Sequence, residues 1–143
     1  MKYRVFLDTN ILLSGIFFEG NESEVLDLLE IEFVTSENVV EELFEVVRKK
    51  LRYLKERNLE IALAETKRAL SDVVVIQKSK YARKVHAAES LISHKKDVPI
   101  LASVLFVKPD YFLTGDSHFF TDKVKDVVTV MTAREFLNHI KKK

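Results

Sequence analysis

The sequence of 143 residues contains no cysteine, no tryptophan, only 3 glycines and only 2 prolines. Without cysteine the chain can form neither a disulfide framework nor a thiolate zinc site, which suits a reducing compartment such as the cytoplasm. So few glycines and prolines leave little room for linkers, and 47% hydrophobic with 31% charged residues is ordinary for a folded protein. We therefore expect one domain spanning residues 1–143.

Long hydrophobic runs are missing as well. Asp8 interrupts the N-terminal apolar run before the hydrophobic region of a signal peptide can form. The apolar run at residues 11–18 is far shorter than the roughly 20 residues of a membrane-spanning helix. These absences favour a cytoplasmic protein without membrane contact.

Charge of one sign is not in excess, because 23 basic and 22 acidic residues leave a net charge of +1. The basic residues are nevertheless clustered between residues 48 and 57, where only Glu56 opposes them. Arg48, Arg52 and Lys55 share one face if a helix continues through them. Such a patch is either a solvated helix face or a surface that binds the backbone of a nucleic acid.

Strand-like runs alternate with helical patterns along the chain. The β-branched and apolar runs predict strands at residues 3–7, 33–35, 73–76, 111–114 and 127–131. Helical spacing of apolar residues predicts helices at 11–18, 23–30, 36–51, 59–70, 81–94, 98–107 and 132–140. This alternation predicts an α/β domain with a mainly parallel central sheet of about five strands and helices on both faces.

Acidic residues stand where these elements meet. Asp8 and Asp116 each follow a predicted strand, Asp97 precedes Pro99 at a helix start, and Glu42 lies early in another helix. Such positions can converge at the carboxyl edge of a parallel sheet, where ligands bind. Converging carboxylates repel one another unless they are protonated or bind a divalent cation, and Mg²⁺ or Mn²⁺ suits oxygen ligands. Helix capping is the alternative role for Asp8 and Asp97.

Four segments carry a resemblance to a known family. They are FLDTNIL at residues 6–12, SENVVEEL at 36–43, DVPILA at 97–102 and LTGDSHF at 113–119. Together they resemble the motif series of the PIN-domain family, across nearly the whole chain. The resemblance implies a Mg²⁺- or Mn²⁺-dependent ribonuclease whose metal-binding and catalytic residues are Asp8, Glu42, Asp97 and Asp116, with Thr9, Asn10 and Thr114 in supporting positions.

The same resemblance extends to partners. Many family members are VapC-like toxins held inactive by a cognate antitoxin, so the resemblance implies RNA as substrate and an antitoxin as a possible partner. It also favours a homodimer, for which the apolar residues Ile16, Phe17 and Phe18 offer a surface if they are not all in the core.

Some positions leave alternatives open. Glu41 stands beside Glu42, and His118 occupies a place where many relatives carry another acid, for which Asp122 is a substitute unless it is a cap or simply exposed. His118 either contacts substrate or is a polar residue at the rim of the site. For the other histidines, His86, His94 and His139, the spacing gives no metal-binding pair, and we expect no functional role.

Two other functions compete with a ribonuclease. A phosphatase of the haloacid-dehalogenase kind would use Asp8 as nucleophile with an acid two residues later, but that position holds Asn10. A non-catalytic module would use the sheet edge and the basic patch to bind RNA or protein. Metal-dependent strand cleavage distinguishes the ribonuclease from both.

Overall fold

The computed structural model describes residues 2–54 and 58–142, so Lys55 lies outside the described residues. The strands are β1 (Tyr3–Leu7), β2 (Ile31–Ser36), β3 (Val73–Ile76), β4 (Tyr111–Leu113) and β5 (Val130–Met131). The α-helices are α1 (Thr9–Phe17), α2 (Asn21–Leu26), α3 (Glu37–Lys49), α4 (Leu59–Leu70), α5 (Lys78–Tyr81), α6 (Val85–Glu89), α7 (Val98–Val107), α8 (Asp122–Lys125) and α9 (Ala133–Lys141). Short 3-10 helices lie at Leu51–Leu54, Ala82–Lys84 and Ser117–Phe119.

The five strands form one parallel sheet in the order β3-β2-β1-β4-β5. β1 lies at the centre, where Phe6 pairs with Val34 of β2 and Phe112 of β4. Its residues Val5, Phe6 and Leu7 are fully buried, as expected for a strand covered on both faces. The predicted α/β fold with a parallel five-stranded sheet is confirmed.

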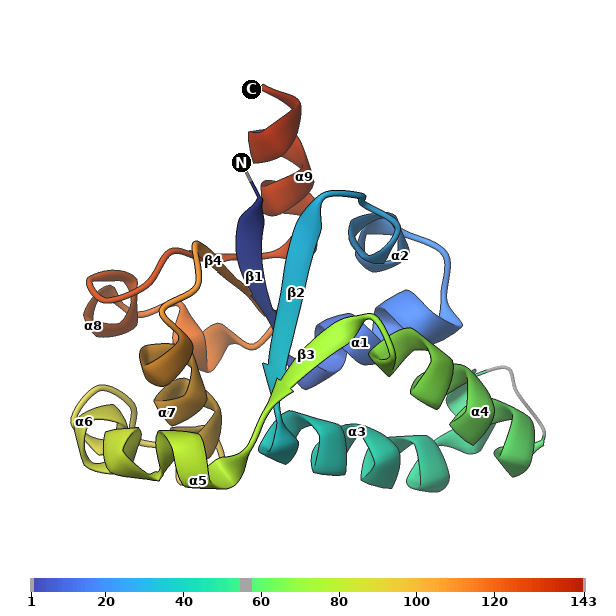
Figure 1. Ribbon diagram of the computed structural model, residues 1–143, viewed down its shortest axis with the longest axis horizontal. Coiled ribbons are helices and arrows are strands. Elements are labelled where there is room, and N and C mark those ends of the chain that lie inside the picture. Colours follow the sequence, from blue (N-terminus) through green and yellow to red (C-terminus); the bar gives the residue numbers. More distant parts are fainter. Residues whose placement is uncertain (1, 55–57, 143) are drawn as a thin grey trace.

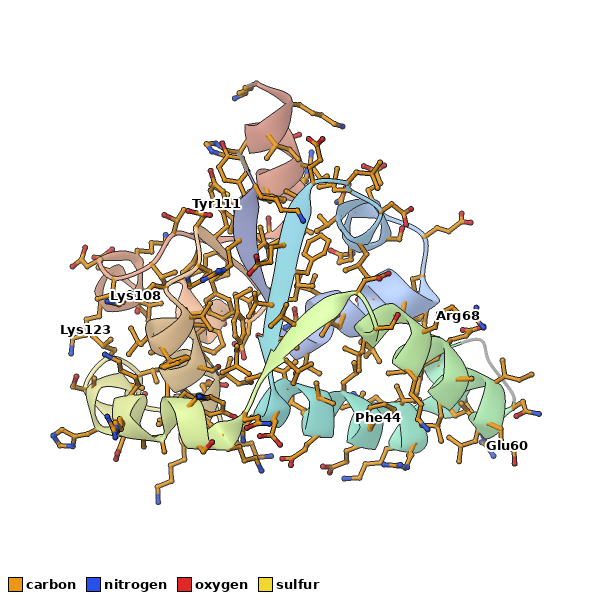
Figure 2. The ribbon with its side chains drawn as sticks, in the orientation of Figure 1. Phe44, Glu60, Arg68, Lys108, Tyr111 and Lys123 are labelled. Carbon is orange, nitrogen blue, oxygen red and sulfur yellow. The ribbon has the colours of Figure 1, made fainter. Side chains whose placement is uncertain are left out.

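The helices cover both faces of the sheet (Figure 1). Helices α1, α2 and α4 lie on one side, α5, α6 and α7 lie on the other, and α3 crosses below the carboxyl ends of the strands. Side chains fill the space between the sheet and the helices (Figure 2). None of the helices in the described ranges is both long enough and apolar enough to cross a membrane.

Several helix ends follow the predicted local chemistry. Ser36 caps α3 by accepting the Val39 N–H, and Asn58 caps α4 by accepting the Ile61 N–H. Thr132 forms a capping box with Glu135 at the start of α9. These caps depend on residues three apart, so local sequence is sufficient to specify them.

The predicted helix at residues 81–94 is wrong in its extent. The chain forms α5, a 3-10 helix and α6, and α6 ends at Glu89. At this point the Ser90 hydroxyl donates a 2.7 Å hydrogen bond to the carbonyl of Ala87, a side-chain bond that competes with helix continuation. Residues 90–91 and 95–97 form turns, and His94 lies in the irregular segment 92–94 between them.

The predicted fifth strand is also shorter than expected. The N–H groups of Val127 and Val128 bond back to the carbonyl of Val124, which holds them in the turn after α8. Only Val130 and Met131 pair with β4. Hydrophobic pattern alone does not distinguish a strand residue from an apolar residue in a turn.

The proposed common face of Arg48 and Arg52 is not formed by one continuous helix. Arg48 lies in α3, which ends at Lys49, and Arg52 lies in the following 3-10 helix. The two helix types advance the chain by different rotations, so the spacing expected from a single α-helix does not apply. Both arginines are exposed.

The surface proposed for dimerisation is only half exposed. Ile16, Phe17 and Phe18 are all partly buried and pack against the core.

Helices α1 and α2 approach closely at Gly15, where an added Cβ would stand 2.4 Å from Leu26 Cδ1. A larger residue at position 15 would therefore require Leu26 or the two helices to move.

Candidate metal centre

Asp8 lies at the end of the central strand, at the start of α1. Its carboxylate is 4% exposed, and it accepts hydrogen bonds from the Thr9 N–H (2.7 Å) and the Thr114 hydroxyl (2.6 Å). Burial raises the pKa of Asp8 to about 6; the two hydrogen bonds lower it, and the charges of Glu42 and Asp116 raise it. Asp8 is therefore both a helix cap and a carboxylate held among other acids.

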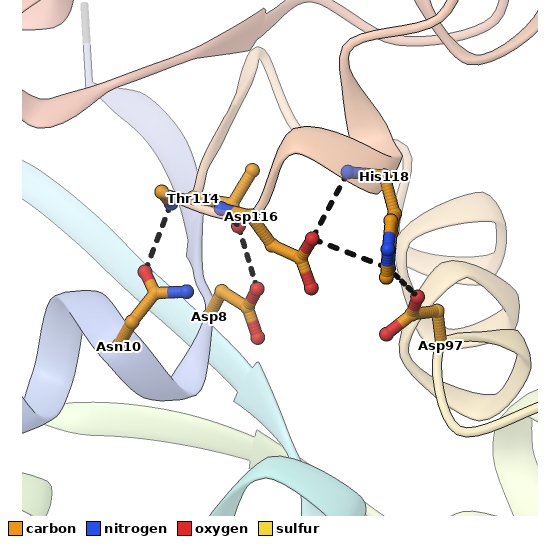
Figure 3. Close-up of polar contacts among 7 residues, drawn as sticks. Asp8, Asn10, Asp97, Thr114, Asp116 and His118 are labelled. Carbon is orange, nitrogen blue, oxygen red and sulfur yellow. Dashed lines mark hydrogen bonds and ion pairs between the residues drawn. The ribbon is translucent and has the colours of Figure 1, made fainter. Parts of the chain in front are cut away.

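The loop after β4 is tied to the end of β1 by two polar side chains (Figure 3). The buried Thr114 hydroxyl donates to Asp8 and accepts the Asp116 N–H at 3.0 Å. Asn10 Oδ1 accepts the Gly115 N–H at 2.9 Å. Thr114 and Asn10, predicted as supporting residues, thus hold the Asp116 loop against Asp8.

Asp97 and Asp116 meet at His118. His118 Nδ1 lies 2.8 Å from Asp97 Oδ2 and 3.3 Å from Asp116 Oδ1, and the His118 N–H also donates to Asp116. Asp97 is buried and stands at the start of α7, but its side chain makes no capping bond, contrary to the predicted role. The Asp97 carboxylate faces His118 instead (Figure 3). His118 consequently lies between two acids of the predicted set.

The ring of His94 also lies in this group, although its spacing along the chain gives no metal-binding pair. Its ring stacks on that of His118, with centroids 3.5 Å apart and planes 11° from parallel. One donor atom each from His94, Asp97 and His118 lies within 4.8 Å of the other two. Spacing along the chain missed the group because His118 comes from the loop after β4, more than 20 positions from the segment that holds His94 and Asp97. His139, by contrast, contacts the Tyr111 hydroxyl at 2.9 Å.

The helix α3 presents Glu42, and not its neighbour Glu41, to this region. Glu42 lines the same cavity as Asp8, Asp97 and Asp116, whereas the Glu41 carboxylate lies 2.7 Å from Lys78 Nζ. Asp122 is exposed in the first turn of α8 and does not line this cavity. The structure therefore gathers the four predicted acids and leaves Asp122 outside.

The cavity has a volume of about 500 Å³ and is lined by both acids and lysines. Lys50, Lys95 and Lys96 contribute to its walls, while Arg48 lines a separate groove on α3 with Phe44. The sequence places Lys50 in the basic patch and Lys95 and Lys96 at a helix end, but gives no sign that the three lysines share a cavity. Within the described ranges, no lysine or arginine forms an ion pair with Asp8, Glu42, Asp97 or Asp116.

Comparisons with known proteins agree with this geometry. The family model of the PIN domain matches residues 6–139. A search of curated proteins found no significant match. The fold is similar to chains in three solved structures: VapBC2 from Rickettsia felis bound to a DNA fragment from its promoter, a toxin-antitoxin complex from Klebsiella pneumoniae, and VapBC-1 from nontypeable Haemophilus influenzae.

The structural similarity covers nearly the whole of each chain. The TM-scores are 0.64, 0.67 and 0.67, with 19%, 19% and 17% sequence identity in the same order. The matches cover 90%, 90% and 92% of this chain and 98%, 97% and 98% of the other chains. At such low identity the likeness concerns the fold.

Proposed function

The chain belongs to the PIN-domain family, and from this starting point we propose that it is a Mg²⁺- or Mn²⁺-dependent endoribonuclease. Asp8, Glu42, Asp97 and Asp116 are the residues that would hold the metal. The observation that carries the proposal is that these four carboxylates line one cavity without a lysine or arginine ion pair among the described residues. A bound cation would reduce the repulsion between carboxylates gathered in this way, and oxygen ligands suit Mg²⁺ and Mn²⁺.

Two further features of the cavity fit a bound divalent ion. Burial, with smaller contributions from the charges of Glu42 and Asp116, raises the pKa of Asp8, and a divalent ion beside it would stabilise the charged form. Thr9 also lines the cavity, and its hydroxyl is buried and has no hydrogen-bond partner in the described structure. A hydroxyl in this state is suited to bond a ligand or an ordered water in the cavity.

In phosphodiester hydrolysis the surrounding residues would position the acids and bind the RNA backbone. A bound metal ion would supply an activated water and neutralise charge on the phosphate. Thr114 and Asn10 keep the Asp116 loop in register with Asp8, and the ammonium groups of Lys50, Lys95 and Lys96 attract the RNA backbone. We also propose that Arg48, Arg52 and Lys55 bind the RNA backbone, a role that rests on their charge and their clustering in the sequence.

The biological setting that we propose is a toxin-antitoxin pair. The similar structures contain VapBC proteins or a toxin-antitoxin complex, and the fold extends over nearly all of each of those chains. In this proposal the protein is the toxin, it acts on RNA in the cytoplasm, and a cognate antitoxin inhibits it.

A metal-dependent cleavage assay tests the central proposal. The wild-type protein, incubated with mixed RNAs, is expected to cleave with Mg²⁺ or Mn²⁺ and to stop when chelator is in excess. Asp8→Asn and Asp116→Asn each keep the side-chain shape but remove a charge, so cleavage should fall by orders of magnitude. Asp122→Asn, on an exposed acid outside the cavity, is the matched control and should cleave normally.

The alternatives give other results in the same experiment. A phosphatase would transfer phosphate to Asp8 and leave the RNA chains intact. A binding module would retain RNA without cutting it. Cleavage that persists in chelator, or wild-type cleavage by Asp116→Asn, would contradict the proposal.

A further inference from the structure

The side chains of His94, Asp97 and His118 form a second group that could hold a metal ion beside the four acids. One donor atom of each lies within 4.8 Å of the other two. His94 comes from the irregular segment after α6, Asp97 from the start of α7 and His118 from the 3-10 helix after β4. The group differs from the set of Asp8, Glu42, Asp97 and Asp116 because it offers two imidazole nitrogens.

Nitrogen ligands favour another class of ion. Mg²⁺ binds oxygen and keeps several waters, whereas Zn²⁺ and neighbouring transition metals bind imidazole together with carboxylate. Three protein ligands with an open fourth position are a common arrangement for zinc. We propose that His94, Asp97 and His118 bind a divalent transition-metal ion of the Zn²⁺ type, at a site that shares only Asp97 with the proposed Mg²⁺ or Mn²⁺ centre.

The distances around His118 are compatible with this assignment. Nδ1 of His118 lies 2.8 Å from Asp97 Oδ2 and 3.3 Å from Asp116 Oδ1. Two ligands that are each about 2.0–2.1 Å from a tetrahedral zinc ion stand roughly 3.4 Å apart, so His118 Nδ1 and Asp97 Oδ2 would separate slightly on binding, and the 3.3 Å contact belongs to Asp116, outside the proposed ligand set. A hydrogen on Nδ1 can point directly at only one of the two carboxylates, so one hydrogen bond does not account for both contacts.

Binding requires one local rearrangement. The rings of His94 and His118 are stacked, and lone pairs in nearly parallel ring planes do not converge on one point. His94 is exposed, so its ring can rotate to another staggered conformation without disturbing the core. Asp97 is buried and His118 is held between Asp97 and Asp116. The site therefore consists of two positioned ligands and one adjustable ligand.

The shared carboxylate couples the two ions. A Zn²⁺ ion that binds Asp97 withdraws this ligand from the Mg²⁺ or Mn²⁺ centre, so the two metals compete. The expected consequence is that Zn²⁺ lowers metal-dependent activity at a fixed Mg²⁺ concentration. The site itself does not rest on RNA cleavage, because Zn²⁺ binding is measured without substrate.

Calorimetric titration with Zn²⁺ in excess Mg²⁺ tests the site. Wild type is expected to bind one Zn²⁺, and His94→Gln and His118→Gln should each lower the affinity by at least about tenfold. His86→Gln replaces another exposed histidine, on α6, and should leave the affinity unchanged. Titration with Co²⁺ should give visible absorption bands of a nitrogen-ligated ion that weaken in His94→Gln.

Two results would overturn the assignment. Equal Zn²⁺ affinity in wild type and His94→Gln would remove His94 from the site. Loss of binding in Asp8→Asn, with binding retained in His94→Gln, would place the ion among the carboxylates. His94 is exposed, so its replacement keeps the test valid even if His118→Gln fails to fold by circular dichroism. Zn²⁺ binding that depends on His94, in a protein that cleaves no RNA, would support this site and refute only the proposed ribonuclease.

Discussion

The hydroxyl of Thr114 donates a 2.6 Å hydrogen bond to the carboxylate of Asp8, although 106 positions separate the two residues in the sequence. The same hydroxyl accepts the N–H of Asp116. Thr114 thus connects the end of β1 to the loop after β4 at the point where two of the four acids meet. A single buried hydroxyl therefore sets both the position of Asp116 and the environment of Asp8.

The first prediction concerns this hydroxyl. Thr114→Val keeps the shape of the side chain but removes the donor to Asp8 and the acceptor for Asp116, so the protein should lose about 1–3 kcal/mol of unfolding free energy. The pKa of Asp8 should rise further, because the hydrogen bond from Thr114 favours the charged form. Chemical denaturation measures the stability. Thr114→Ser is the control and should recover most of it; an equal decrease in both variants would assign the effect to packing.

The second prediction concerns pH. The pKa of Asp8 is raised from 3.8 to about 6 in the folded protein, so the folded state holds this proton more tightly than the unfolded chain does. Below about pH 4 the ionisation of Asp8 therefore takes almost nothing from the free energy of unfolding. This free energy falls as the pH rises from about 4 to about 6, and above about pH 6 it is lower by about 3 kcal/mol. Asp8→Asn removes this cost, so without metal it should be more stable than wild type at pH 7.

Melting curves in chelator at pH 4 and pH 7 measure this difference. The advantage of Asp8→Asn should shrink at pH 4, where the wild-type carboxyl is almost fully protonated in the folded state and folding therefore no longer requires a buried charge. Mg²⁺ should raise the melting temperature of wild type at pH 7 more than that of the variant, since the ion binds the folded state. Asp122→Asn serves as the exposed control. A wild type that is more stable than Asp8→Asn at pH 7 without metal would refute the prediction.

The third prediction compares two basic surfaces. Lys50, Lys95 and Lys96 line the cavity, whereas Arg48 and Arg52 lie outside it. Replacement of the three lysines with Gln should weaken RNA binding and flatten its dependence on salt, by about 0.7 in the logarithmic slope for each single-strand phosphate that is no longer neutralised. Arg48→Gln with Arg52→Gln should have a smaller effect. Fluorescence anisotropy at several salt concentrations measures the RNA affinity of both variants and its dependence on salt. A larger effect of the arginine replacements would indicate that RNA binds outside the cavity, near the end of α3.

The fourth prediction concerns the packing of α1 on α2. Gly15→Ala places a Cβ 2.4 Å from Leu26 Cδ1 and 3.1 Å from the carbonyl oxygen of Glu22, so the helices or Leu26 must move. A decrease of about 1–3 kcal/mol in unfolding free energy is expected. A double-mutant cycle with Leu26→Ala checks the cause, because removal of the Leu26 side chain should relieve part of the penalty. Strict additivity of the two changes would exclude this contact as the reason.

The fifth prediction is the homodimer favoured by the family resemblance. Ile16, Phe17 and Phe18 keep part of their apolar surface exposed while they pack against the core. Removal of this remaining surface from water would favour association. Sedimentation at tens of micromolar should give the mass of two chains. A single chain at that concentration would contradict the prediction and leave the exposed parts of these residues as ordinary surface.

Local sequence was sufficient for the elements whose stability comes from nearby residues. The buried run Val5-Phe6-Leu7 and the caps at Ser36 and Thr132 follow from apolar pattern and from hydrogen bonds that span three residues. The order of acids along a β–α alternation was likewise enough to predict that Asp8 and Asp116 meet at one edge of a parallel sheet. These features depend on alternation and chemistry within short segments, which the sequence contains.

Tertiary structure decided the features that depend on helix rotation and on contacts between distant loops. Glu42 and Val46 of α3, and Lys50 directly after it, are spaced four residues apart and line the cavity. Glu41 lies one residue, or about 100°, around the helix and pairs with Lys78. The local sequence around Glu41 and Glu42 does not predict which side of α3 faces the edge of the sheet.

The same reason applies to His94. Its predicted helix ends early at Ser90, and the segment that follows carries its ring onto His118, 24 positions away. Sequence spacing measures separation along the chain, whereas a metal ligand set depends on separation in space. The sequence by itself therefore determined the sheet and the acids at its edge, and only the packing of α6, α7 and the loop after β4 decided that two histidines stand beside them.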